Sequence, residues 1–325
     1  MKKKVLVLGS VNNLPTMYAH DLALQQAELI LVSGFLKRHE LHDPKKFFMN
    51  QKVPDNLKLK RLPFFNHFLL PFYSFLYFLL MKLFIIRNWK PDVVIFNDSY
   101  ISLSKFFPQA FKVFLPHGGD IETWCGFTDI DNTGLANSMK KASLFKYVPS
   151  AYIRKHLITF IRKKYTDGLN HCDVLIYFPE SFTEITRKIK KYCVKNGIEY
   201  WERYDLSLKP ILKYSADDKR KFRNRAFEII VPVRFAFKTF GEGNKVFNKS
   251  NDLILLGIDE FLKQHENKEV IVTLFEKGAD LEEAKKIVAN CEFLKDRAVW
   301  IKPVSLDDLI EKIFESDFCF DGVGD

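Results

Sequence analysis

Short aliphatic segments alternate with longer helical patterns along almost the whole chain, and this alternation constrains the fold more than any other feature. The first strand-like segments are residues 5–9, 29–33, 57–62, 93–96, 112–115 and 174–178. The main helical patterns between them are residues 18–27, 72–87 and 151–165. Such alternation is typical of βαβ units, in which helices join parallel strands. It predicts an α/β domain with a doubly wound, mostly parallel sheet.

The pattern is interrupted once and then resumes. In residues 202–227 the periodicity fades and charged residues accumulate, which is typical of an interdomain linker. Strand-like segments return at residues 228–233, 270–275, 298–301 and 318–321, with helical patterns at 251–264, 281–289 and 306–314. We therefore expect two Rossmann-like domains, residues 1–201 and 228–325. Because doubly wound sheets usually have five or six strands, we expect the second domain to be incomplete.

Composition excludes several classes of protein. With 325 residues, 47% of them hydrophobic, the chain can bury two cores. Its five cysteines are scattered and never spaced as Cys-x-x-Cys, which argues against a disulfide framework or a zinc site and favours the cytoplasm. The net charge is +10, but no nucleic-acid-binding motif accompanies the basic clusters. We expect no nucleic-acid partner, and attribute the charge to attraction for anionic lipid or a lipid-linked substrate.

One aromatic segment raises the question of a membrane. Residues 62–81 contain no Asp, Glu, Lys or Arg, and about 20 apolar residues can cross a bilayer. A crossing would put the strands at 5–9 and 93–96 on opposite sides of the membrane, where they could not share a sheet. We therefore favour a buried or surface-docking helix, with peripheral contact at the inner face of the membrane as an alternative.

The loop after the first predicted strand is a candidate binding loop. Gly9, Ser10 and Asn12 follow that strand and precede a helical pattern, so substrate could approach backbone N–H groups there. The Gly-x-Gly-x-x-Gly pattern of dinucleotide-binding proteins is absent. The alternative is an ordinary turn between a strand and a helix.

A second loop, after the strand at 112–115, combines groups suited to chemistry. It reads His117-Gly118-Gly119-Asp120. Two glycines allow a ligand close to the backbone, His117 can donate or accept a proton, and Asp120 can orient a hydroxyl group or the imidazole. Because doubly wound folds bind ligands at the carboxyl edge of the sheet, we regard His117 and Asp120 as candidate catalytic residues.

The second domain offers cations at a similar place. Arg234 follows a predicted strand and Lys249 precedes a predicted helix, so both could hold a diphosphate. Lys238 and Lys245 are rivals for the lysine role, and a solvated pair of basic residues is the alternative.

A possible metal-binding pattern lies beyond His117. Asp129 and Asp131 have the Asp-x-Asp spacing by which some transferases hold a divalent metal. Because the pattern lies in an expected loop rather than at the end of a hydrophobic strand, we expect loop capping or solvation and assign no metal site.

Together these segments resemble glycosyltransferases of the GT-B fold, most of all family 4, also called group 1. The resemblance rests on the His-Gly-Gly-Asp loop, on Pro-Val-Arg at 232–234, on Lys-Ser-Asn-Asp-Leu at 249–253 beside the family's Lys-Gly-x-Asp-Leu, and on Leu-Glu-Glu-Ala at 281–284 followed by Val-Ser at 304–305. It implies two Rossmann-like domains, and donor diphosphate neutralised by Arg234 and Lys249 or Lys238 without a metal cofactor. It also places the acceptor near the Gly9 loop and the His117 loop.

Two departures from the family accompany the resemblance. Glu276-Lys277-Gly278 stands where the family often has a Gly-x-Gly loop on the donor side. The family's paired glutamates, spaced as Glu-x7-Glu, have no counterpart up to residue 325.

The leading hypothesis is a glycosyltransferase that moves a sugar from a nucleotide-diphosphate-sugar donor to a saccharide or lipid-linked acceptor. The resemblance implies retained anomeric configuration and a role in bacterial surface polysaccharide or glycan synthesis. The alternatives are a non-catalytic, membrane-associated binding subunit related to glycosyltransferases, and a sugar-nucleotide epimerase.

Overall fold

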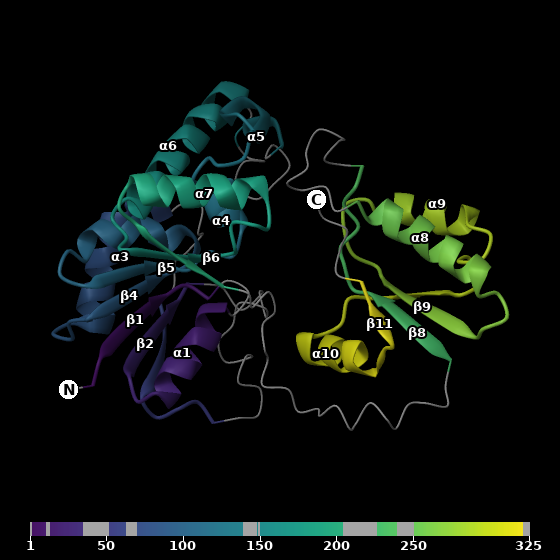
Figure 1. Ribbon diagram of the computed structural model, residues 1–325, viewed down its shortest axis with the longest axis horizontal. Helices are drawn as coiled ribbons and strands as arrows, with labels where there is room; N and C mark the ends of the chain where they lie inside the picture. Colours follow the sequence, from purple (N-terminus) through teal and green to yellow (C-terminus); the bar gives the residue numbers. More distant parts are fainter. Residues whose placement is uncertain are drawn as a thin grey trace. The chain divides into compact units, whose positions relative to one another are not determined.

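The chain forms two compact α/β units, Met1–Ile211 and Leu212–Asp325 (Figure 1). The computed structural model describes residues 2–10, 14–34, 52–62, 70–138, 148, 150–203, 226–238 and 250–320. The two end residues of the expected linker, Glu202 and Phe227, belong to strands rather than to a linker.

The first unit is built on a seven-stranded parallel sheet with the order β3-β2-β1-β4-β5-β6-β7. Its strands are β1 (Lys4–Leu8), β2 (Glu28–Ser33), β3 (Leu57–Arg61), β4 (Val93–Phe96), β5 (Phe111–Phe114), β6 (Val174–Tyr177) and β7 (Glu199–Glu202). The interior strand β1 pairs with β2 and β4, and Val7 faces Leu31 on one side and Ile95 on the other. Since the chain runs outwards from β1 to β3 and then returns to β4, the order reverses between β1 and β4. Doubly wound folds bind ligands at such a switch point.

Helices cover both faces of this sheet. They are α1 (Leu14–Leu24), α3 (Leu70–Met81), the π-helical turn η4 (Lys82–Ile86), the 3-10 helix η5 (Asp98–Phe106), α4 (Gly119–Glu122), α5 (Asn132–Ser138), α6 (Ala151–Leu169) and α7 (Glu184–Lys195). Helix α1 packs on the face that carries Val5 and Val7. Ile95 of β4 also lies on that face. Because side chains alternate along a strand, the next residue, Phe96, lies on the opposite face, where it packs against Phe107 at the end of η5. Helices α3 and α6 both contact η5.

The aromatic segment forms a short helix. Helix α3 and the turn η4 cover most of the predicted helix 72–87, whereas residues 63–69 lie outside the described residues. In the described part of the chain, no helix has both the length and the apolar character needed to cross a bilayer.

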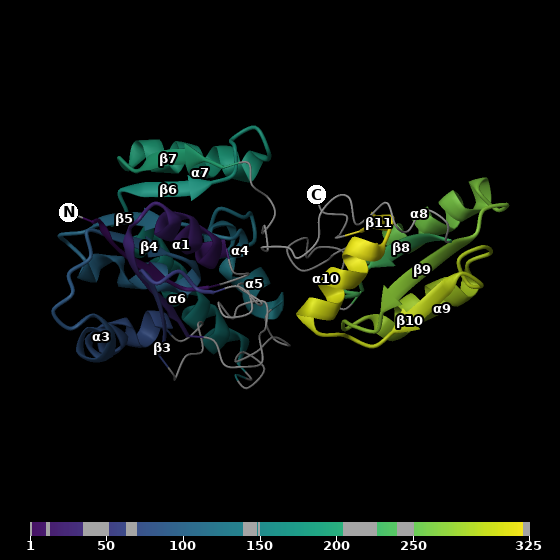
Figure 2. The same cartoon turned by 90° about the horizontal axis from the view of Figure 1, so that it is seen from below.

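Several elements of the first unit were not predicted. Strand β7 was missed because its sequence, Glu-Tyr-Trp-Glu, is polar at both ends; among the described strands it pairs with β6 alone. Helix α7 lies along β6 and β7 (Figure 2) and begins with a capping box between Thr183 and Thr186. The predicted helix at 18–27 begins earlier and ends earlier, at Leu14 and Leu24.

The second unit is a four-stranded parallel sheet with the order β10-β9-β8-β11. Its elements are β8 (Phe227–Val231), α8 (Asn251–Gln264), β9 (Val270–Phe275), α9 (Leu281–Asn290), β10 (Ala298–Ile301), α10 (Leu306–Glu315) and β11 (Phe318–Cys319). Buried residues of β8, β9, α8 and α9 share one core. Strand β8 ends two residues before the predicted end at residue 233. The order reverses between β8 and β11, so this unit has a switch point of its own.

Candidate functional site

The carboxyl edge of the first sheet begins with the predicted glycine loop. Gly9 follows β1 with a φ of +104°, and a Cβ atom there would lie 2.9 Å from the carbonyl oxygen of Asn97, which follows β4. Only glycine fits this close approach across the switch point. Ser10 is buried, and Asn12 lies outside the described residues. The loop therefore brings the ends of β1 and β4 into contact.

Asp120 organises the predicted His-Gly-Gly-Asp loop. The residue is 1% exposed. Oδ1 accepts hydrogen bonds from the backbone N–H groups of His117, Gly118 and Ile121, each 3.0 Å away. Oδ2 accepts from the N–H of Asp98 at 3.2 Å. Because these bonds occupy both oxygens, Asp120 fixes the loop and ties it to the end of β4.

His117 carries a positive charge at neutral pH. Its Nδ1 lies 3.2 Å from Oδ2 of Asp120, and its side chain is 26% exposed. Burial alone would lower the pKa of His117, but the negative charges of Asp120 and Asp98 outweigh it and raise the pKa to about 9. The imidazolium can therefore donate a hydrogen bond or attract an anion, and its proton is not readily lost at pH 7.

The two glycines of the loop lie near a hydrogen-bonded pair, buried Tyr177 and partly buried Glu122. Gly118 and Gly119 lead into α4, and a Cβ atom on Gly119 would meet no atom within 4 Å. The Tyr177 hydroxyl group, at the end of β6, donates to Glu122 over 2.6 Å. Burial, followed by the charge of Glu122, raises the pKa of Tyr177, so its phenol stays neutral. The loop backbone is thus open at Gly119 and supported from β6.

Sequence reasoning missed two polar residues at this edge, Asn97 and Asp98. The amide Nδ2 of Asn97 donates to the carbonyl of Leu115 at 2.7 Å. Asp98 has a left-handed φ of +54°, and its Oδ1 accepts a hydrogen bond from Tyr165 of α6 at 3.1 Å. A signal was present, because a polar pair directly follows the buried strand 93–96 and strand ends of this kind carry site residues.

Arg203 was missed as well, and it follows a strand that was not predicted. Its backbone N–H donates to Tyr177 at 2.8 Å, and its Nη2 donates to the carbonyl of Pro116 at 2.9 Å. The guanidinium lies over the ring of Phe178, 4.8 Å from the ring centre, and the residue is 6% exposed. The contact with Pro116 puts a second cation directly beside the His117 loop.

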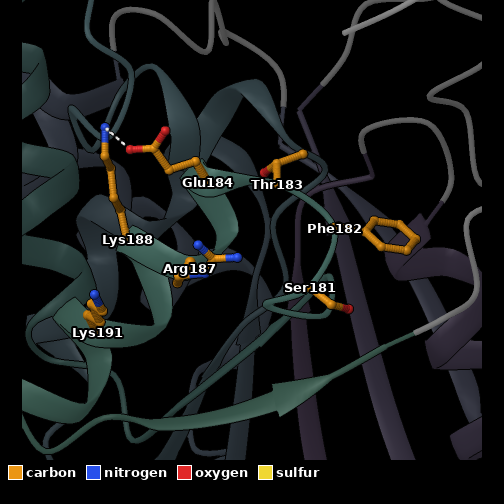
Figure 3. A pocket seen from close by; sticks show the side chains of 7 residues that line it. All are labelled: Ser181, Phe182, Thr183, Glu184, Arg187, Lys188 and Lys191. Atoms are coloured by element: carbon orange, nitrogen blue, oxygen red, sulfur yellow. Dashed lines mark ion pairs between the residues drawn. The ribbon is translucent and has the colours of Figure 1, made fainter.

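A basic pocket of about 500 Å³ opens at the N-terminus of α7. Its lining residues are Ser181, Phe182, Thr183, Glu184, Arg187, Lys188 and Lys191 (Figure 3). Lys188 lies 3.3 Å from Glu184 and 3.1 Å from Asp129. Among the described residues, Arg187 and Lys191 have no ion-pair partner. The pocket is therefore cationic.

Both carboxylates of the Asp-x-Asp pattern have partners among the described residues. Asp129 pairs with Lys188, and Oδ1 of Asp131 accepts from the N–H of Gly134 at 2.6 Å, in the first turn of α5. Within the described ranges, we find no group of three or more His, Cys, Asp or Glu side chains that could hold a metal ion.

In the second unit, two loops meet at the carboxyl edge of the sheet. Arg234 lies three residues beyond β8, is exposed, and makes no hydrogen bond or ion pair with the described residues. The next residue, Phe235, pairs with Gly278, where a Cβ atom would lie 2.2 Å from the carbonyl oxygen of Phe235. Oδ2 of Asp280 accepts from the N–H groups of Phe237 and Lys238, at 2.7 and 2.8 Å. The arrangement fixes the backbone beside Arg234 and leaves its guanidinium open.

The other predicted donor-side residues that the structure describes differ from Arg234 in having partners. Lys238 lies 3.3 Å from Glu283, and Glu276 lies 2.9 Å from Lys285, so both side chains have partners. Lys277 contributes its carbonyl to the N–H of Phe235 at 2.8 Å. Lys249 and its rival Lys245 lie outside the described residues.

Comparison with known proteins identifies the fold. No protein-family model matches the sequence, and no curated protein matches it significantly. Among similar solved structures, Phytolacca americana UGT2 with UDP-2-fluoro-glucose and pterostilbene has 9% identity and a TM-score of 0.53 over 98% of this chain and 75% of that one. A Polygonum tinctorium UDP-glucosyltransferase capable of glucosylating indoxyl has 8% identity and a TM-score of 0.53 over 97% of this chain and 75% of that one.

A bacterial enzyme shows the same likeness. The α,α-trehalose 6-phosphate synthase of Burkholderia multivorans has 8% identity and a TM-score of 0.50 over 98% of this chain and 76% of that one. Identities this low show the fold and nothing finer. The chain therefore has the α/β fold of the GT-B glycosyltransferases, as its sequence predicted.

Proposed function

We propose that this protein is a glycosyltransferase that moves a sugar from a nucleotide-diphosphate-sugar donor to a saccharide or lipid-linked acceptor. The observation that supports it most is the gathering of polar groups at the carboxyl edge of a switch-point sheet in each unit, on a fold whose solved examples include a complex with UDP-2-fluoro-glucose.

In this proposal the second unit holds the donor. Arg234 is exposed and unpaired among the described residues, so its guanidinium is free to bind the diphosphate. Lys249 or Lys238 supplies a second cation, and Lys238 would first leave Glu283. Negative charge builds on the diphosphate as the bond to the sugar breaks, and fixed cations stabilise that charge without a metal.

The first unit holds the acceptor. The acceptor hydroxyl oxygen forms a bond to the anomeric carbon while the bond to the diphosphate oxygen breaks, and the hydroxyl proton passes to the departing diphosphate. The His117 imidazolium donates a hydrogen bond to an oxygen of the acceptor, and Asp120 positions it. We further propose family 4 membership, retained anomeric configuration and a role in bacterial surface glycan synthesis, on the motifs at 117–120, 232–234 and 249–253.

The proposal is tested by binding and transfer. Calorimetry with UDP, GDP and ADP, followed by transfer assays with the matching sugar nucleotides, is expected to show binding and turnover. Arg234→Ala is expected to weaken nucleotide-diphosphate binding at least tenfold, because a charge-assisted contact is lost. Arg297→Ala, which removes a guanidinium bonded to the Glu266 carbonyl, serves as the matched control. Absence of binding for every nucleotide diphosphate would refute the proposal.

A sugar-nucleotide epimerase would give a different outcome. Incubation of a labelled sugar nucleotide without acceptor would then yield the epimer, whereas a transferase yields only slow hydrolysis.

A second candidate function, docking to an anionic membrane, is favoured by one surface. Six large apolar side chains of α3 and η4 are 37–67% exposed: Phe72, Phe75, Leu76, Leu79, Leu83 and Phe84. We call them the apolar strip. Basic residues lie on or beside it, with Lys82 in η4, Arg87 directly after it, and Lys105 on η5, which α3 contacts. Apolar side chains beside exposed cations fit an interface rich in anionic lipid.

Vesicle co-sedimentation tests this surface. Vesicles of phosphatidylcholine with phosphatidylglycerol are expected to retain the protein, and vesicles of phosphatidylcholine alone to retain less. The double variant Phe75→Asp/Phe84→Asp is expected to abolish retention. Val194→Asp, at an exposed position of α7, is the control and is expected to bind as the parent does. Equal retention of all three proteins would exclude the strip as a docking surface. A protein that docks but neither binds nor transfers sugar nucleotides would be the non-catalytic subunit.

A further inference from the structure

Arg203 is a buried cation whose hydrogen-bonding groups are largely unused. The residue is 6% exposed, and its Nη2 donates to Pro116. Its Nε and Nη1 atoms are shielded from solvent, and neither makes a hydrogen bond within the described part of the chain. No carboxylate among the described residues forms an ion pair with it. Burying an uncompensated charge is costly, so this arrangement needs an explanation.

Two other arginines of the same unit show how a structural arginine is satisfied. Arg154 is 3% exposed, with Nε bonded to the Ala136 carbonyl and Nη1 to the Val148 carbonyl. Arg162 is partly buried, and its three nitrogens donate to Thr123, Asn132 and Ile130. Arg203 is the exception among these three.

The surroundings of Arg203 favour an anion. Phe178 covers one face of the guanidinium, and the contact with Pro116 places it beside His117, a second cation. The nearby carboxylates are already engaged: Asp120 by backbone N–H groups, Asp98 by Tyr165, and Glu122 by Tyr177. An oxyanion of a ligand would complete the bonds that Arg203 leaves open.

We propose that Arg203, together with His117, binds an oxyanion of the substrate, a phosphate or a carboxylate, at the carboxyl edge of the first unit's sheet. This inference rests on the proposed function in placing substrate at that edge. It adds a negatively charged group to the substrate and a site for that group in the first unit, separate from the cations of the second unit.

Inorganic phosphate is the probe. Titration at constant ionic strength, followed by the thermal unfolding midpoint, is expected to show saturable stabilisation of the parent protein. Arg203→Met is expected to weaken phosphate binding at least tenfold. Arg203→Lys keeps a charge but loses the planar donors, and a similar loss is expected. Arg297→Met, which also removes an Nη2 bond to a backbone carbonyl, is expected to bind phosphate as the parent does.

Stability without phosphate gives an independent reading. Removing an uncompensated buried charge is expected to leave the unfolding midpoint of Arg203→Met unchanged or higher in phosphate-free buffer. A lower midpoint with unchanged phosphate affinity would overturn the proposal and make Arg203 structural. Phosphate binding that is lost in Arg187→Gln and kept in both Arg203 variants would place the anion in the basic pocket at α7, and would also overturn it.

Two further ligands identify the source of the oxyanion. If it belongs to the donor, Arg203→Met weakens UDP binding; if it belongs to an acidic acceptor, the variant weakens glucose 6-phosphate binding and spares UDP. Phosphate binding through Arg203 without any sugar transfer would support this inference while refuting the proposed function. Sugar transfer by a protein whose phosphate affinity is unchanged in the Arg203 variants would support the proposed function and refute this inference.

Discussion

The His117–Asp120 loop of the first unit and the Arg234 loop of the second differ in how far their charges are already neutralised. In the first unit, Asp120 accepts four backbone N–H bonds and contacts His117, so this pair is balanced within the protein, whereas Arg203 beside it keeps two nitrogens without a bond among the described residues. In the second unit, Asp280 fixes a similar loop, but the neighbouring Arg234 is exposed and unpaired among the described residues. The His117 loop is pre-organised by internal bonds, whereas the loop of the second unit presents an exposed cation that is open to an external ligand.

The largest effect is expected where the internal balance is removed. Asp120→Ala would leave four backbone N–H groups and the His117 imidazolium without their acceptor, and is expected to cost about 3–5 kcal/mol of unfolding free energy. Urea unfolding followed by circular dichroism measures it. Asp129→Ala, which removes a carboxylate that is 93% exposed, is the control, with an expected change within about 0.5 kcal/mol. Similar effects of the two variants would contradict this account.

In the second unit, a substitution at one glycine of the carboxyl edge is expected to strain the backbone. Gly278 has a φ of +122°, and a Cβ atom there would overlap the backbone of Phe235. Gly278→Ala is expected to destabilise the second unit by about 3 kcal/mol, through the unfavourable φ and the required shift of Phe235. At Gly197, φ is +68° and no atom lies within 4 Å, so Gly197→Ala is expected to cost only about 1 kcal/mol. Thermal unfolding of both variants checks the difference.

A pH dependence should belong to the first edge. The pKa of His117 is raised from 6.5 to about 9 in the folded state, so its stabilising contribution is complete below pH 6.5 and is lost as pH rises through 9. Unfolding free energies at pH 6, 8 and 10 should show a decline of up to about 3 kcal/mol. His117→Gln should remove this part of the decline. If the variant's profile parallels that of the parent, His117 is not the group responsible.

The smallest effect on stability is expected at the open cation. Arg234→Ala should change the unfolding free energy by less than about 0.5 kcal/mol, because the guanidinium has no described partner. The same variant should show its loss in nucleotide-diphosphate binding. A marked loss of stability would show that Arg234 is structural, and the contrast between the two edges would disappear.

Much of the site could be predicted because it follows strand ends. Gly9, His117, Asp120 and Arg234 were nominated from their places after buried strands, and the structure puts each at a carboxyl edge. Arg203 could not be found in this way, because the strand before it is short and polar at both ends. Lys238 illustrates another limit: its ion pair with Glu283 joins residues 45 positions apart, and the sequence pattern does not report such a contact.

The sequence by itself determined the α/β class, the parallel sheets and the loops that carry the polar groups, because alternation of strand and helix periods is a local property of the chain. The tertiary structure decided the charge states and partners. Asp120 became an anchor and His117 an imidazolium because segments distant in sequence converge on one sheet edge, where burial and nearby charges set the pKa of the imidazole. Arg203 became a buried cation for the same reason, since only the pairing of β7 with β6 carries it to that edge.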